Sequence, residues 1–129
     1  MTEPKRVLLV GWNPDSVDYS KHPDLTAEKV RDALETDRSQ LVSSGYDAQW
    51  CFLSSMEAGE RELYEALDGQ FFDCVLIGAG VRLDPETTVL FSRLVNLVHV
   101  LAPEALFSFN SNPSDTAQSV QRCLPIDRD

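Results

Sequence analysis

Asp73-Cys74-Val75-Leu76-Ile77-Gly78-Ala79-Gly80 stands near the middle of the 129-residue sequence, and Val81-Arg82-Leu83 then leads into Asp84-Pro85-Glu86. The apolar run before the glycines predicts a short strand that is buried on both faces, as in the centre of a parallel sheet. The glycines predict a tight turn, and Asp84 with Pro85 predicts the capped start of a helix. In α/β proteins the carboxyl end of such a strand is where ligands bind.

The same alternation of strand and helix extends over the whole chain. Strands are predicted at 6–11, 46–52, 73–78 and 105–109, and the helices between and after them at about 26–44, 54–68, 85–101 and 113–123. Ser54 and Glu57 have the spacing of a capping box at the start of the second helix. Strict alternation of this kind implies parallel strands joined by right-handed crossovers.

The apolar pattern of each strand predicts its position in the sheet. Val7-Leu8-Leu9-Val10 and Cys74-Val75-Leu76-Ile77 are continuously apolar, whereas strand 46–52 alternates between apolar and polar residues and is expected at an edge. These preferences give the strand order 2-1-3-4. We therefore expect an α/β fold, a three-layer sandwich of flavodoxin-like or Rossmann-like type. Residues 1–129 form one domain in this interpretation, with 124–129 as a frayed tail.

Composition and charge narrow the class of protein. The net charge of −10 disfavours binding to nucleic acid or to anionic lipid, and the sequence has no apolar run long enough to span a membrane. The first six residues lack the features of a signal peptide, so we expect a cytoplasmic protein. None of the three cysteines belongs to a Cys-x-x-Cys pair, which predicts reduced, mostly buried thiols without a metal or redox role.

The strand order predicts a ligand crevice where the carboxyl ends of strands one and three meet. Trp12 is expected to cover the ligand, Arg82 to orient an acidic group, and the asparagines to donate or accept hydrogen bonds. The leading hypothesis is a domain that binds a small polar or acidic ligand, with ligand and cofactor left open. The candidate ligand-binding residues are Trp12, Asn13, Gly78, Gly80, Arg82, Asn110 and Ser111.

Two alternatives use other residues of the same loops. In a hydrolase-like enzyme, Asp15 or Asp18 would act as the general base, and the backbone amides of Gly80 and Ser111 would stabilise developing charge. For Arg82 itself, an ion pair with Asp15, Asp18 or Asp84 is the alternative to ligand binding. Asp15, Asp18, His22 and Asp24 match no metal-binding spacing, so no metal site is predicted.

The predicted helix 85–101 has a wider apolar arc than one face of a sheet requires. This excess favours a homodimer formed through that helix, and it leaves open a third interpretation, a non-catalytic dimeric interaction subunit. The arc consists of Leu90, Phe91, Leu94, Val95, Leu97, Val98 and Leu101.

The topology resembles flavodoxins and response-regulator receivers, but the loop Gly11–Ser16 lacks the hydroxyl-rich phosphate-binding pattern of flavodoxins, and Gly78 stands where receivers carry an aspartate. The combination of residues 73–82, 96–99 and 109–115 resembles that of small uncharacterised bacterial α/β proteins. This resemblance implies the fold and supplies no activity.

Overall fold

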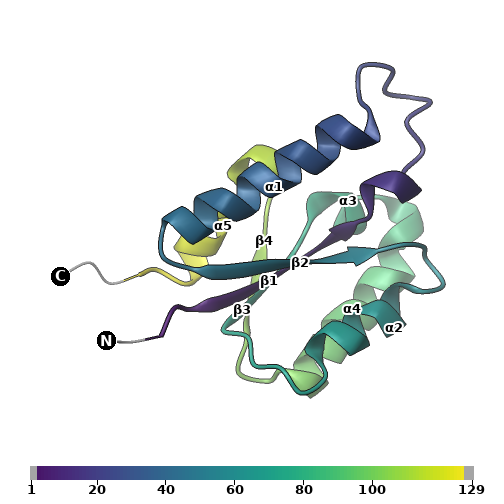
Figure 1. Cartoon of the computed structure of the whole chain (residues 1–129). Helices are drawn as coiled ribbons and strands as arrows, with labels where there is room; N and C mark the ends of the chain where they lie inside the picture. The colour runs from purple at the N-terminus through teal and green to yellow at the C-terminus, as the bar shows by residue number, and fades with distance from the viewer. Residues whose placement is uncertain (1–2, 127–129) are drawn as a thin grey trace.

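The computed structural model describes residues 3–126 and contains a four-stranded sheet with the order β2-β1-β3-β4 (Figure 1). All three strand pairs are parallel. The strands are β1 (Arg6–Trp12), β2 (Asp47–Leu53), β3 (Cys74–Ile77) and β4 (Leu106–Phe109). The predicted α/β class, the parallel sheet and the order 2-1-3-4 are confirmed.

Helices cover both faces of the sheet and complete a three-layer sandwich (Figure 1). On one face lie α1 (Ala27–Ser43) and α5 (Thr116–Cys123), and on the other lie α2 (Gly59–Leu67) and α4 (Thr88–Leu101). Short 3-10 turns precede three of the helical segments: η1 (Pro14–Ser16), η2 (Pro85–Thr87) and η3 (Pro113–Asp115).

The two central strands supply the middle of the core. Every residue of Val7–Val10 and Cys74–Ile77 is completely buried. Their side chains alternate between the α2/α4 layer and the α1/α5 layer, so each strand contributes to both hydrophobic clusters. This double burial explains why both strands read as continuous apolar runs in the sequence.

The predicted start of the 85–101 helix and that of the 113–123 helix are confirmed. The Asp84 side chain accepts a hydrogen bond from the Glu86 amide at 2.9 Å, and Asn112 forms a capping box with Asp115. In both cases a proline occupies the first turn, where its missing N–H costs no hydrogen bond.

The capping box predicted for Ser54 and Glu57 is wrong. Helix α2 begins only at Gly59, and the carboxylate of Glu62 accepts the hydrogen bond from the Ser54 amide at 2.9 Å. The hydroxyl of Ser55 instead accepts from the Ala58 amide at 3.0 Å. Residues 54–58 therefore form a turn between β2 and α2. The carboxylate of Glu62, in the first turn of α2, caps the end of β2.

The turn predicted at Gly78–Gly80 is in fact the start of a one-turn helix, α3 (Ala79–Arg82). Gly78 has a φ of −68°, which any residue can adopt. Its role is spatial, because a Cβ atom there would lie 3.2 Å from the carbonyl oxygen of Val10. The missing side chain lets the ends of β1 and β3 approach closely.

The described part of the expected frayed tail packs against the domain. The Tyr46 hydroxyl donates a hydrogen bond to the Leu124 carbonyl at 2.6 Å, and Leu124 and Ile126 lie against the cluster between the sheet and the α1/α5 layer. Residues 127–129 of that expected tail lie outside the described residues.

We predict that Gly45→Ala destabilises the protein more than Gly69→Ala. Both glycines have positive φ, +105° and +70°, and an alanine in the left-handed region costs about 1–2 kcal/mol. At Gly45 the new methyl group would also lie 3.2 Å from Ile126, whereas at Gly69 it meets nothing within 4 Å. Urea unfolding of both variants measures the difference. Equal losses would show that Ile126 does not pack at this position.

Candidate functional site

A cleft of about 280 Å³ lies at the carboxyl ends of β1 and β3, where the strand order places the topological switch point. Its walls come from the end of β1, the loop after η1, helix α1, the middle of β2 and helix α3. The lining residues are Gly11, Trp12, Val17, Tyr19, Leu25, Val30, Leu34, Trp50, Gly78, Ala79, Gly80, Val81 and Asn110.

Three aromatic side chains of the cleft donate hydrogen bonds to backbone carbonyls of the protein itself. The indole N–H of Trp12 donates to the Gly80 carbonyl at 3.0 Å, and the Tyr19 hydroxyl donates to the Pro14 carbonyl at 2.7 Å. The indole N–H of Trp50 donates to the Leu34 carbonyl at 3.0 Å. Since these donors are occupied, the rings offer mainly carbon surface to the cleft.

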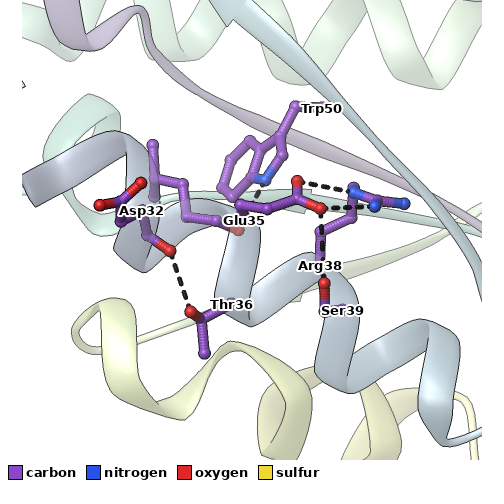
Figure 2. A network of polar contacts seen from close by, with 7 residues as sticks. Asp32, Glu35, Thr36, Arg38, Ser39 and Trp50 are labelled. Carbon is purple, nitrogen blue, oxygen red and sulfur yellow. Dashed lines mark hydrogen bonds and ion pairs between the residues drawn. The ribbon is translucent and has the colours of Figure 1, made fainter. Parts of the chain in front are cut away.

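Trp50 is held between β2 and α1. Figure 2 shows its indole nitrogen directed at the backbone of α1. Beside it lies an ion pair, in which Nε and Nη2 of Arg38 donate to the Glu35 carboxylate at 2.9 and 2.6 Å. The ring stacks on Phe52 with 5.3 Å between centroids. The exposed ion pair adds little stability, so the wall of the cleft is fixed chiefly by the packing and hydrogen bond of Trp50.

Four of the predicted ligand-binding residues line the cleft: Trp12, Gly78, Gly80 and Asn110. Arg82, which was expected to hold an acidic ligand, is not among the lining residues. Its guanidinium donates to the Asn110 carbonyl and lies 5.3 Å from the centre of the Phe109 ring. Arg82 takes part in none of the ion pairs found among residues 3–126, and its role in holding a ligand stays a prediction.

Asn110 reaches the cleft, but its side-chain amide holds the fold together. Its Oδ1 accepts from the Ala79 amide at 2.8 Å, and its Nδ2 donates to Thr116 Oγ1 at 3.0 Å. Thr116 Oγ1 in turn donates to Asp37 Oδ2 at 3.1 Å. This chain of hydrogen bonds ties α3, β4, α5 and α1 together beside the cleft.

Asp37 is a buried carboxyl, with only 6% of its surface exposed. Burial raises its pKa above the usual value, the hydrogen bond from Thr116 opposes that rise, and the nearby negative charge of Asp115 adds to it. The network therefore ends in a group whose charged form is costly to bury.

The remaining predicted polar residues lie outside the cleft lining and interact locally. The Asn13 side chain accepts from the Asp15 amide at 2.9 Å and so caps η1. The Ser111 amide, proposed above as a donor to developing charge, is 3.1 Å from a carboxylate oxygen of Asp115.

The two candidate general bases, Asp15 and Asp18, also interact with neighbouring residues. Asp15 forms an exposed ion pair with Arg31 at 2.7 Å. Asp18 accepts a hydrogen bond from the Ser20 amide at 2.9 Å, and hydrogen bonds from Ser20 lower the pKa of its carboxyl. A lowered pKa makes a carboxylate a weaker base at neutral pH.

A second hollow of about 320 Å³ adjoins the cleft and shares Trp12 and Val17 with it. Three carboxylates line this hollow, those of Asp18, Asp84 and Glu86, and Arg82 does not line it. The surroundings of the cleft are therefore acidic on the side of β1 and η2.

Neither the thiols nor the other ionisable groups form a metal site in the part of the chain that the structure describes. Among residues 3–126, no three His, Cys, Asp or Glu side chains lie close enough together to hold a metal ion. Burial raises the pKa of the Cys51 and Cys74 thiols to about 12, whereas Cys123 is exposed. No helix within 3–126 has the length and apolar character needed to cross a membrane.

Sequence reasoning missed most of the apolar wall. Val30 and Leu34 stand four residues apart on α1, and Trp50 lies on a predicted edge strand, so the pattern of each is also typical of a core position. Tyr19 and Leu25 belong to the long loop before α1. The length of that loop already indicates from the sequence that Tyr19 is near the crevice, because a long connection beside a switch point is often part of a binding site.

Comparison with known proteins leaves the site to be interpreted from its own geometry: no protein-family model matches the chain, and no curated protein matches its sequence.

We predict that Asp37→Asn stabilises the protein at about pH 7 and has almost no effect at about pH 4. Because the pKa of Asp37 is raised in the folded state, the folded protein binds the proton more tightly than the unfolded chain. Stability is therefore lost as the pH rises from 3.8 through the folded-state pKa. Asparagine has the same shape and no charge to bury.

Thermal unfolding between these pH values measures the effect. Asp32→Asn, at an exposed position of the same helix, is the matched control. A destabilised Asp37→Asn variant at neutral pH would mean that the ionised carboxylate supports the network.

Proposed function

We propose that this chain is a binding domain for a small molecule with a flat, largely apolar body. The observation that carries the proposal is the cleft at the switch point, whose walls are formed by Trp12, Trp50 and Tyr19 together with aliphatic side chains of α1. Its volume of about 280 Å³ is near the lower limit of small-molecule pockets, which start at about 300 Å³. A single ring system with a short substituent is of suitable size.

The charges around the cleft favour a neutral or cationic ligand over an acidic one. Asp18, Asp84 and Glu86 line the adjoining hollow, and Arg82 is turned toward β4. The net charge of −10 adds a long-range field that attracts cations and repels anions. This proposal keeps the predicted crevice and replaces the small polar or acidic ligand expected from the sequence with a largely apolar one.

No observation favours the hydrolase-like alternative. The ion pair of Asp15, the lowered pKa of Asp18 and the occupied amide of Ser111 all weaken the roles that an acyl-transfer site would need. Binding without chemistry requires only the cleft.

We predict that 2-phenylethylamine changes the intrinsic tryptophan fluorescence of the protein in a saturable way. Both tryptophans of the chain line the cleft, so their emission reports directly on its occupancy. Val30→Phe fills part of the cleft and should abolish the response. Val42→Phe, at a position of α1 that is 46% exposed and outside the cleft, should leave it intact. Equal titrations of both variants would contradict the proposed site.

We also predict that 2-phenylethylamine binds about twofold to fivefold more tightly than 3-phenylpropanoate, the range expected for exposed charge interactions. The two probes share a phenyl ring and differ in the sign of their charge. The double variant Asp18→Asn, Glu86→Gln should bring the affinities for the two probes closer together, whereas Glu65→Gln on α2 should leave their ratio unchanged. A carboxylate that binds more tightly would overturn the preferred ligand charge and leave the cleft itself untouched.

A further inference from the structure

Strand β4 leaves one side of its backbone open. It is an edge strand that pairs only with β3 in the described sheet. The Leu106 amide donates to the Asp73 carbonyl at 2.9 Å, so in a parallel ladder the backbone groups of Phe107 and Phe109 point to the open side. Its sequence, Leu-Phe-Ser-Phe, contains neither a charge nor a proline, the usual means of protecting an edge.

Acidic residues are distributed unequally between the two halves of the domain. Beside β2, helices α1 and α2 carry seven carboxylates, and β2 itself begins with Asp47. Beside the other edge, α4, β4 and α5 contain none. The carboxylates nearest to this half stand in its turns: Asp84 and Glu86 before α4, Glu104 before β4 and Asp115 before α5. The seven carboxylates belong to Glu28, Asp32, Glu35, Asp37, Glu60, Glu62 and Glu65.

One flank of α4 borders β4. The rings of Phe91 and Phe109 meet edge to face at 6.1 Å between centroids, which identifies the side of the helix that faces the strand. Residues three and four apart share a helix face, so Thr88, Val95 and His99 lie on the same flank. Thr88 and His99 are exposed, and Val95 is half-buried. This flank combines apolar surface with the polar side chains of Thr88 and His99, and it contains no carboxylate.

We propose that two copies of this chain associate through β4, with their open edges paired antiparallel about a twofold axis. A twofold axis presents the same surface on both partners, and an edge that offers the same donors and acceptors in each copy is complementary to itself in the antiparallel arrangement. The two sheets of four strands then form one continuous sheet. On the α4 side of that sheet, the Thr88–His99 flanks of the two copies meet.

The distribution of charge on the chain favours a second copy as the partner of this surface. Each chain carries −10, so most approaches of two copies are repulsive, and the repulsion is least at α4, β4 and α5, which contain no carboxylate. A strand of four residues provides few hydrogen bonds, so the helix flank must supply part of the stabilisation. The proposed dimer differs from the one expected from the sequence, since the edge strand and not the helix alone forms its centre.

Sedimentation velocity at micromolar concentrations tests the proposal. The wild-type protein should sediment as a dimer of the 14.4-kDa chain, with tighter association as salt rises and screens the net charge. The double variant Thr88→Glu, His99→Glu should be a monomer. Each copy would bring two new carboxylates to the twofold axis, so four would meet there. The control is the double variant Val89→Glu, Val100→Glu. It adds the same charges at exposed positions of α4 that face away from β4, so it should remain dimeric. Far-ultraviolet circular dichroism confirms that each variant is folded.

Hydrogen exchange tests the strand pairing separately. The amides of Phe107 and Phe109 should be protected in the dimer and exchange faster in the Thr88→Glu, His99→Glu variant. A monomeric wild-type protein would overturn the proposal, as would a dimer that only the Val89→Glu, Val100→Glu control disrupts. Unchanged exchange at Phe107 and Phe109 when the dimer dissociates would overturn the paired edges. A monomeric result would leave the proposed cleft standing, because one chain supplies all of its lining residues.

Discussion

The side-by-side pairing of β1 and β3 is the constraint on which the rest of this structure depends. Val10 pairs with Ile77, and the Gly78 amide donates to the Val10 carbonyl at 2.9 Å, so the two strands end together. The chain then leaves β1 toward α1 on one face of the sheet and leaves β3 toward α4 on the other (Figure 1). A gap opens wherever two neighbouring strands continue to opposite faces, and the cleft occupies that gap.

The apolar character of the cleft follows from how the protein uses its own polar groups. The donors of Trp12, Tyr19 and Trp50 are bound to backbone carbonyls, and the amide of Asn110 joins α3 to α5. Satisfying these groups internally avoids the cost of burying them unpaired. The same bonds fix the walls in place and leave carbon surface for a ligand. The arrangement ends in Asp37, whose burial lowers stability, so rigidity here is obtained at some cost.

The sequence predicted those features that one local pattern controls. The apolar runs of β1 and β3 encode their central positions, and Asp84-Pro85 and Asn112-Pro113 encode two helix starts. It failed where a distant contact decides the outcome. Glu62 caps the end of β2 from within the next helix, a contact that the spacing of Ser54 and Glu57 did not indicate. Trp12 was predicted at the crevice, whereas Trp50 was not, since its contact with Leu34 forms only after folding.

The cleft and the proposed interface share a structural element, and this links the two proposals physically. Strand β4 presents Phe107 and Phe109 at its open edge and continues directly into Asn110, whose side chain holds α3 against the cleft. The Phe109 ring also lies beneath Arg82 at the end of α3. Pairing of β4 with a second strand would restrain its backbone, and that restraint would pass through Asn110 to the wall formed by Ala79 and Gly80. One wall of the cleft is thus held by a side chain that follows an edge strand, and a second copy would give β4 the second neighbour that β1 and β3 already have within the sheet.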